Sequence, residues 1–301
     1  MLIRGLVCLS LRSKASTSTK LSRGYAALPP LITPPELIQS LQNGNISNPK
    51  FVDCRATADY DKGHIHGASN LPIIWDYLID SSSKETLAKL RQDFVEALAS
   101  NGVASTDPIV AYEQNMHSRR GSCRGKFLFD YIGCRDVTVL HGGYDAWLKS
   151  KYYDEFLKSA ISQEHRRSKE ECLKSYEGLS PVDDTMLTRE DILAALNDKR
   201  IWILDTRDDD EWKGLASAGH GAECPRKGRI PGSTWLRWLD LINQGGADSG
   251  HFKKPEEIRQ ILNNAMMALQ SAGFRNVKNY FASWNEWARD EKLPIDSEVL
   301  D

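Results

Sequence analysis

The sequence has 301 residues, of which 41% are hydrophobic and 27% charged, and its formal net charge at pH 7 is −2. This length allows two domains of ordinary size, and the composition is that of a folded globular protein, which excludes the fibrous and disordered classes. The near-neutral charge argues against a nucleic-acid partner, and no apolar run is long enough to cross a membrane.

The N-terminal segment has the composition of an organelle transit peptide. No acidic residue precedes Glu36, and serines and threonines are interspersed with five basic residues, Arg4, Arg12, Lys14, Lys20 and Arg23. A short apolar patch over residues 2–9 would suit a secretory signal, but a basic residue interrupts it and basic residues continue beyond it. We therefore expect residues 1–25 to be a mitochondrial transit peptide and the protein to reside in the mitochondrial matrix.

Two matched segments mark the start of two similar halves of the chain. Residues 31–38 and 186–193 each place a threonine, Thr33 or Thr188, three positions before an acid at the head of an apolar helical run. A threonine at this position can accept the exposed N–H groups of the first helical turn, and Glu36 can complete a capping box. Both segments are therefore predicted to begin short amphipathic helices.

Each predicted helix leads into an apolar strand that ends in an Asp-x-Arg pattern. The pattern places Asp53 and Arg55 after the first strand, and Asp205 and Arg207 after the second. We expect each pair to form a structural ion pair at its strand end, without a catalytic role.

Two further landmarks recur in the same order. A glycine-framed turn occupies residues 63–67 in the first half and 228–232 in the second. A strand followed by a tryptophan-bearing helix then occupies residues 137–147 and 277–287. Short apolar strands that alternate with amphipathic helices predict an α/β fold, in which helices cover both faces of a parallel sheet.

The repeat also indicates where the chain divides. Residues 151–184 between the two halves are polar, so we interpret them as a partly helical linker. We accordingly predict an N-terminal α/β domain at 26–150 and a C-terminal α/β domain at 185–301.

Taken together, these landmarks resemble the tandem-domain rhodanese family, the thiosulfate and 3-mercaptopyruvate sulfurtransferases. The resemblance covers about residues 30–295 and implies two rhodanese-like domains. In that family the C-terminal domain is usually the catalytic one, and a cysteine at the end of its central strand opens a loop of inward-facing N–H groups. The resemblance implies that this thiolate takes sulfur from a small anionic donor, holds it as a persulfide and passes it to a thiophilic acceptor such as cyanide.

The second half of this chain lacks the segment that should carry the cysteine. From the glycine-framed turn to the last strand there are 70 positions in the first half but 45 in the second. The strand at 109–112 and the loop after it have no counterpart, and no cysteine follows Cys224. We therefore expect an incomplete C-terminal domain that lacks an inner strand. Because unpaired buried backbone is costly, this domain should either close up around the gap or fold poorly.

The first half contains one weak catalytic candidate, Cys123. It lies between a strand end and a helix start, where the flanking Arg120 and Arg124 would favour a thiolate and attract anions. Against this role, Glu113 and not a cysteine follows the strand, at the position of the family's nucleophile. A half-buried helix thiol beside a solvated basic loop is the simpler interpretation.

The second half contains one candidate for binding the donor. Arg226 matches an arginine that in the family helps to hold the anionic donor, whereas the nearby Cys224 matches no known role and is interpreted as filling its loop. The six cysteines form no C-x-x-C pair and have no zinc-ligand spacing, so we expect free thiols, no metal site and no cofactor.

These observations leave two functions open. The first is a sulfurtransferase for thiosulfate or 3-mercaptopyruvate whose activity is impaired because the cysteine loop is absent. The second is a non-catalytic rhodanese-like module that binds or regulates a partner. A rhodanese-related phosphatase is excluded, because it would need an arginine six positions after Cys123, where Phe129 stands.

Overall fold

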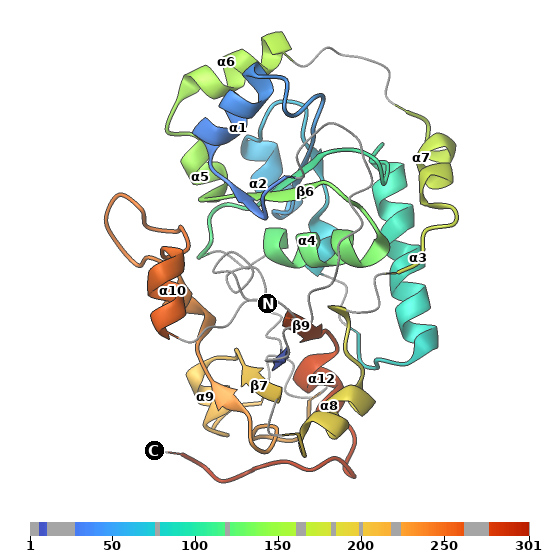
Figure 1. Ribbon diagram of the computed structural model, residues 1–301, viewed down its shortest axis with the longest axis vertical. Coiled ribbons are helices and arrows are strands. Elements are labelled where there is room, and N and C mark those ends of the chain that lie inside the picture. The colour runs from blue at the N-terminus through green and yellow to red at the C-terminus, as the bar shows by residue number, and fades with distance from the viewer. Residues whose placement is uncertain are drawn as a thin grey trace.

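The computed structural model of the chain describes residues 6–10, 28–75, 79–117, 121–160, 167–181, 185–198, 201–217, 224–261 and 277–300. These residues form a five-stranded and a four-stranded sheet, each packed with helices (Figure 1). We call the part around the five-stranded sheet, residues 28–160, the first unit. The part around the four-stranded sheet, residues 185–300 together with 6–10, is the second unit.

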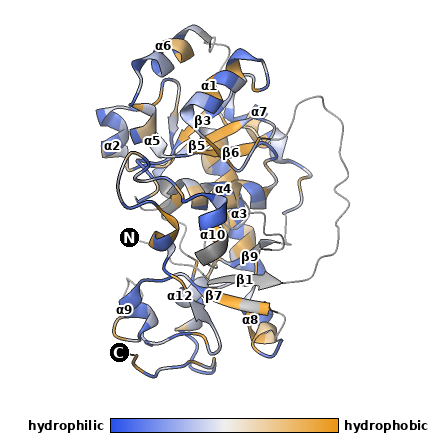
Figure 2. Cartoon of the chain, turned by 60° about the vertical axis from the view of Figure 1, so that its left-hand side comes forward, coloured by the Kyte–Doolittle hydropathy of each residue, from blue (hydrophilic) through white to orange (hydrophobic). Residues whose placement is uncertain are grey.

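The first sheet is parallel throughout, as the sequence predicts. Its strands lie in the order β2 (Leu31–Ile32), β6 (Val137–Leu140), β5 (Ile109–Tyr112), β3 (Lys50–Asp53) and β4 (Ser69–Asn70). Every residue of β5 and β6 is buried, and Figure 2 shows hydrophobic colour along both strands. Burial on both faces requires a layer of helices on each side.

Alternate residues of these strands belong to two different cores. Phe51, Val110 and Leu140 lie in a core formed with α1 (Pro34–Gln42), α5 (Gly143–Trp147) and α6 (Lys151–Ala160). Val52, Ala111 and Val139 lie in a core formed with α3 (Lys84–Ser100) and α4 (Gly121–Ile132). The remaining short helices, α2 (Thr57–Lys62) and η1 (Pro72–Trp75), flank β4 in the chain.

Both predicted helix caps are present. The Glu36 carboxylate accepts the backbone N–H of Thr33 at 2.8 Å, and the Thr33 hydroxyl accepts the N–H of Glu36, which completes the predicted capping box. In the second half, Thr188 and Asp191 form the same arrangement at the start of α8 (Arg189–Ala195). Thr33 and Thr188 therefore both cap the N-terminus of the helix that follows them.

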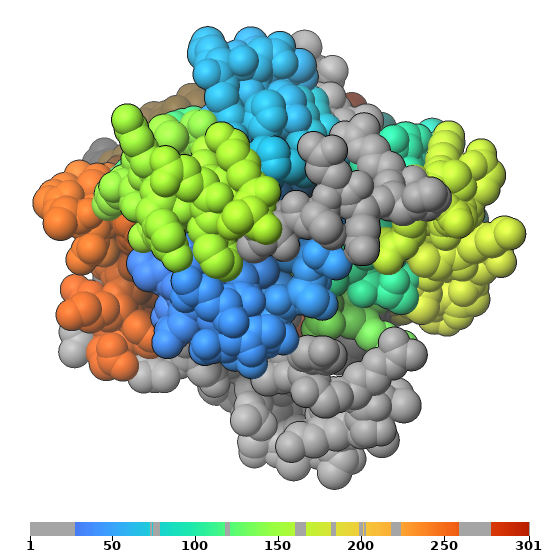
Figure 3. Space-filling model, turned by 90° about the horizontal axis from the view of Figure 1, so that it is seen from above, coloured from blue at the N-terminus to red at the C-terminus, as the bar shows by residue number. Residues whose placement is uncertain are grey.

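The segment predicted as a partly helical linker contains α6 and α7 (Lys169–Tyr176). Leu157 of α6 is fully buried in the first unit's core, and Figure 3 shows α6 beside α1 on the surface. Cys172 of α7 is also fully buried, in a small cluster with Ala99 of α3. Both helices therefore pack onto the first unit. The predicted domain boundaries at residues 150 and 185 stay predictions.

The second sheet is only partly parallel. Its order is β8 (Thr234–Trp235), β7 (Ile201–Asp205), β1 (Leu6–Ser10) and β9 (Val277–Tyr280). β7 and β8 are parallel, but β1 runs antiparallel to both of its neighbours. The surrounding helices are α8, α9 (Asp209–Trp212), η3 (Trp238–Leu241), α10 (Pro255–Ile261) and α12 (Ser283–Trp287).

The sequence predicted that the C-terminal domain would either close up around the gap left by the missing strand or fold poorly, and this prediction is wrong. Within the described part of residues 185–300, no strand corresponds to β5, as the sequence predicts. The neighbouring strands do not close up, however, because β1 from the predicted transit peptide lies between them. Strand pairing in either direction satisfies neighbouring backbone groups, which is why an antiparallel segment fits a parallel sheet.

A continuous core joins the two units. The ring of Phe127 on α4 stacks on that of Phe281, with centroids 5.6 Å apart. The N–H of Met116 donates to the carbonyl of Gly250 at 3.0 Å, and the N–H of Ser82 donates to the Glu286 carboxylate at 2.7 Å.

In the described segments of the chain, no helix has the length and apolar character needed to span a membrane.

Candidate active site

The carboxyl ends of β3 and β7 carry the two Asp-x-Arg pairs, which the structure confirms as ion pairs. Arg55 Nη2 and Arg207 Nη2 each lie 2.6 Å from an oxygen of Asp53 and Asp205, respectively. The pair in the second unit is fully buried on both sides. A charge that is taken out of water needs such a partner, because an unpaired buried ion is strongly destabilising.

Each arginine also ties its strand end to two other landmarks of the repeat. In the first unit, Arg55 donates to the carbonyl of Gly63 at 2.6 Å, and its guanidinium lies 4.2 Å from the ring centroid of Tyr144. In the second unit, Arg207 donates to the carbonyl of Gly228 at 2.8 Å and lies 4.4 Å from the ring centroid of Trp284. The repeated landmarks are therefore joined in space by these two arginines.

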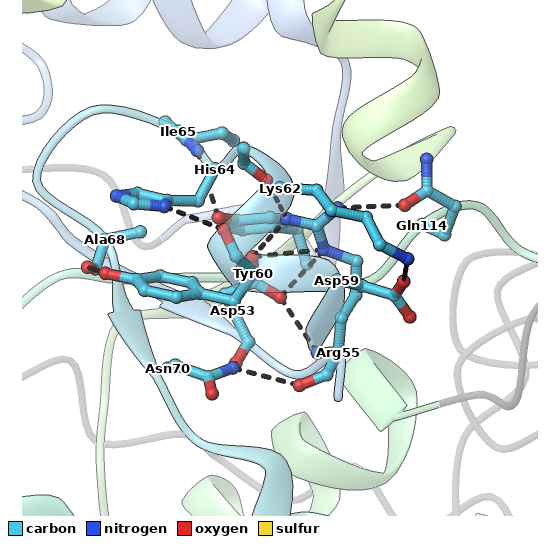
Figure 4. A network of polar contacts seen from close by, with 12 residues as sticks. Asp53, Arg55, Asp59, Tyr60, Lys62, His64, Ile65, Ala68, Asn70 and Gln114 are labelled. Atoms are coloured by element: carbon cyan, nitrogen blue, oxygen red, sulfur yellow. Dashed lines mark hydrogen bonds and ion pairs between the residues drawn. The ribbon is translucent and has the colours of Figure 1, made fainter. Parts of the chain in front are cut away.

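Figure 4 shows the polar network around Arg55. Arg55 Nη1 donates to the side-chain oxygen of Gln114 at 2.9 Å, which links the end of β3 to the loop after β5. The ring of His64 stacks on that of Tyr60 at 3.8 Å, and its Nδ1 lies 3.0 Å from the Tyr60 carbonyl. His64 therefore packs against Tyr60 of α2.

Among the described residues, no group of three or more His, Cys, Asp or Glu side chains is arranged to hold a metal ion.

The resemblance to the rhodanese family predicts that the loop after β5 is the first unit's equivalent of the active loop. Its first residue, Glu113, is buried, and its carboxylate accepts the N–H of Gly121 at 2.9 Å and the hydroxyl of Ser122 at 2.7 Å. These two donors stand at the start of α4, where the helix dipole favours an anion. The chain's own carboxylate therefore occupies the position that a bound anion would need. The sequence places Glu113 at the strand end but contains no signal for these two contacts.

Cys123 lies in the first turn of α4, half-buried and packed against the core that joins the units. The guanidinium of Arg124 lies 4.5 Å from the ring centroid of Phe281, so this side chain faces the second unit. Arg120 lies outside the described residues. Catalysis by Cys123 and anion binding by Arg120 and Arg124 stay predictions.

Arg226 holds the end of α12. Its guanidinium donates to four backbone carbonyls, those of Trp287, Ala288, Asp290 and Leu293, at distances from 2.5 to 3.2 Å. Carbonyls at a helix C-terminus lack partners within the helix, so a cation there satisfies them. These contacts give Arg226 a structural role, and binding of a donor anion by it stays a prediction.

Three other thiols are poorly suited to nucleophilic attack. Burial raises the pKa of Cys134 to about 12, and burial also raises the pKa of Cys172. The pKa of Cys54 is raised well above its usual value, first by burial and then by the carboxylates of Asp53 and Glu113. A nucleophilic cysteine must be a thiolate, so these residues are protonated packing groups at neutral pH. Cys224 is also fully buried, with its sulfur 3.3 Å from the Asn285 amide oxygen.

An open cleft of about 470 Å³ lies where the two units meet. Asp80 and Ser81 line it from the first half of the chain, and the other lining residues come from the second half: Arg189, Glu286, Arg289, Asp290, Glu291 and Lys292. Its four acidic side chains outnumber its three basic ones. This balance of charge does not favour a small anionic sulfur donor.

A pair of histidines that the sequence does not single out lies between the units. The rings of His141, after β6, and His251, in the second unit, have centroids 4.8 Å apart. His141 Nε2 accepts the backbone N–H of Phe252 at 2.8 Å and so carries no proton. Burial, followed by the proximity of His251, lowers the pKa of His141 to about 4. The two residues are far apart in the chain, so only the fold reveals the pair.

Comparison with known proteins extends these observations. Residues 33–150 match the family described as "Rhodanese-like domain". A protein of Haloferax volcanii named "Putative thiosulfate sulfurtransferase" is 28% identical over 267 residues, which cover 80% of this chain and 85% of that protein. A Corynebacterium glutamicum protein named "Thiosulfate sulfurtransferase" is 26% identical over 263 residues, which cover 79% of this chain and 81% of that protein.

A solved structure also resembles this chain. The wild-type structure of EanB superimposes with a TM-score of 0.66 at 18% identity, and the match covers 90% of this chain and 70% of that one. This likeness concerns the fold alone. The rhodanese-like domain at 33–150 and the sulfurtransferase relatives that align along most of the chain support the rhodanese sulfurtransferase family.

Proposed function

We propose that this chain is a sulfurtransferase-family protein that moves sulfane sulfur from thiosulfate or 3-mercaptopyruvate to a thiophilic acceptor such as cyanide, at a strongly impaired rate. The relatives named for thiosulfate support the choice of donor. The impairment rests on one observation: the strand end where the family places its nucleophile carries Glu113 in the first unit and has no counterpart in the described second unit.

The chemistry explains why this observation decides the rate. Sulfur transfer by this route needs a thiolate that takes the sulfur from the donor, releases sulfite from thiosulfate or pyruvate from 3-mercaptopyruvate, and then remains as a persulfide. Burial keeps Cys54, Cys134 and Cys172 protonated, and Cys123 is half-buried within a helix. A carboxylate such as that of Glu113 cannot replace a thiolate in this role.

A second function is favoured by the contacts of Glu113. Because its carboxylate satisfies the start of α4 from within the chain, the first unit is complete without a bound anion. A non-catalytic rhodanese-like module that binds or regulates a partner would retain this arrangement.

An assay of thiocyanate formation separates the two functions. The full chain is mixed with cyanide and either thiosulfate or 3-mercaptopyruvate, alongside the variants Cys123→Ser and Cys134→Ser. We expect all three proteins to produce thiocyanate slowly, at a rate above the uncatalysed one. Rapid turnover that is lost in Cys123→Ser and kept in Cys134→Ser would identify Cys123 as the nucleophile and would contradict the proposed impairment. The absence of turnover in a folded protein favours the binding module.

We also propose that the protein resides in the mitochondrial matrix. The acid-free, basic and serine-rich composition before Glu36 supports this location. A fluorescent protein fused after residue 35 should accumulate in mitochondria, and the same fusion with Arg4, Arg12 and Arg23 changed to glutamate should not. Equal distribution of the two fusions would contradict the location.

A further inference from the structure

The N-terminal strand β1 has two neighbours that are distant from it in the chain. Its register pairs Leu6 with Asp205 and Ser10 with Ile201 on β7, and Leu6 with Tyr280 and Leu9 with Val277 on β9. β1 is therefore an inner strand, paired along both edges. Inner strands supply hydrogen-bond partners to two neighbours at once, and an inner strand cannot be removed without leaving both unpaired.

The place that β1 occupies is the place of the missing strand. In the first sheet β5 lies between β3 and β6, and in the second sheet β1 lies between β7 and β9. β3 corresponds to β7 because both end in the Asp-x-Arg pair, and β6 corresponds to β9 because both lead into the aromatic-bearing helices α5 and α12. β1 thus stands at the position of β5, in the opposite direction.

The sequence of this segment suits an inner strand. Residues 6–9 read Leu-Val-Cys-Leu, an apolar run without an acid or a base. Inner strands of sheets that are covered on both faces have continuous apolar sequences of this kind. The addition of an extended segment to an open sheet is also a recurrent mode of recognition, in which backbone hydrogen bonds supply the affinity.

We propose that Leu6–Ser10 is a structural strand that completes the second sheet of the uncleaved chain, and that cleavage of the N-terminal segment reopens this sheet between β7 and β9. The segment thereby has a second role beside targeting. Before cleavage it stands in for the strand that the second unit lacks. After cleavage, the backbone groups of β7 and β9 that pair with β1 lose their partners.

A cross-linking experiment tests the register directly. Cys8 is the register partner of Ile203, and antiparallel partners lie close enough for a disulfide. Oxidation of the full-length Ile203→Cys variant with diamide should link residues 8 and 203, as peptide mass spectrometry would show. The Leu204→Cys variant is the matched control, because neighbouring strand residues face opposite sides of the sheet. Equal linkage in the two variants, or linkage in neither, would overturn the proposal.

Hydrogen exchange provides a second, independent test on the full chain. The variant Val7→Pro removes a backbone N–H from β1, and the same substitution at Ser18, which follows β1, is its control. In Val7→Pro we expect at least tenfold faster exchange in β7 and β9, with β3 and β5 unchanged. Unchanged exchange in β7 and β9, or an equal increase in all four strands, would contradict the proposal.

The same measurement identifies the source of the strand. A peptide of residues 2–14 added to the Val7→Pro protein should restore slow exchange in β7 and β9, whereas that peptide with proline at position 7 should not. Protection in the unmodified chain should be independent of protein concentration. Protection that rises with concentration would show that a second copy supplies the strand, against an intramolecular one.

Discussion

The ion pair between Asp205 and Arg207 is fully buried, and the same pattern in the first unit is nearly so. The sequence predicted both pairs, because an Asp-x-Arg pattern directly after an apolar strand places two opposite charges at a buried strand end. It did not predict that Arg207 would also contact Gly228 and Trp284, since those contacts depend on how the turn and the last helix pack.

Removal of the buried charge of Arg207 should strongly destabilise the protein. We expect Arg207→Met to lower the free energy of unfolding by about 3–5 kcal/mol, because it leaves Asp205 buried without its partner. Arg237→Met is the control: its pair with Asp240 is about 40% exposed on each side and should cost less than about 1 kcal/mol. Urea unfolding measures both values, and similar losses in the two variants would contradict the structural role.

Titration of His141, which lies at the contact between the units, should make the stability of the protein depend on pH. Its pKa is lowered from 6.5 to about 4, first by burial and then by His251. Between these two values the unfolded chain binds a proton that the folded chain does not. Stability is therefore complete above about pH 6.5, decreases as the pH falls, and levels off below about pH 4.

His141 should account for at most about 3–4 kcal/mol of the decrease in the free energy of unfolding between pH 6.5 and pH 4. Urea unfolding between pH 4 and pH 7 measures it, and His141→Gln should flatten the dependence, because glutamine can accept the Phe252 N–H without titrating. A dependence of equal steepness in the variant would assign the effect to other groups.

The turn between β6 and α5 is an element that has a counterpart in the second unit. Gly143, the first residue of α5, has a φ of +62°, and Ser283, the first residue of α12, has a φ of +54°. The sequence indicated a turn at both sites, from the glycine pair in the first half and by the repeat in the second. It could not indicate that the Gly143 backbone lies against the loop after β5.

Substitution of Gly143 should be far more costly than that of an open glycine. A methyl group on Gly143 would lie 2.4 Å from the Glu113 carbonyl oxygen and 2.6 Å from that of Gln114, both of which are backbone atoms. We expect Gly143→Ala to lower the free energy of unfolding by more than about 3 kcal/mol.

Gly67→Ala is the matched control for this prediction. Its φ is +78°, but no atom lies within 4 Å of the added methyl, so about 1 kcal/mol is expected from the backbone conformation alone. Thermal or urea unfolding compares the two variants. If both lose the same stability, the close approach of Gly143 to the loop is not a constraint.

At the scale of the whole molecule, the sequence predicted the duplicated α/β plan and the gap in the second half. Both follow from local patterns: apolar strands, helix caps, Asp-x-Arg pairs and their spacing. The strand that fills the gap was not predicted, because β1 and its partners at 201–205 and 277–280 are separated by most of the chain. The basic residues on either side of β1 are typical of a leader segment, so the composition of the N-terminal segment did not predict a strand.

The candidate site, like the fold, was predictable only where it depends on local sequence patterns. The absence of a cysteine at the family position can be read from the spacing of the landmarks. The Glu113 carboxylate at the start of α4 and the histidine pair between the units could not be, since they depend on side chains that meet only in the folded chain. The proposed account is of a chain that resembles the rhodanese sulfurtransferases and has no cysteine where the resemblance places the family's nucleophile.

The most direct test of this account looks for sulfur bound to the protein. The full chain is incubated with thiosulfate in the absence of acceptor, and each cysteine is then examined by peptide mass spectrometry under non-reducing conditions. The account predicts that only a small fraction of the protein gains a sulfur atom at any cysteine. A stoichiometric persulfide on Cys123 that disappears in Cys123→Ser would contradict it, and would show that the first unit carries the family's chemistry.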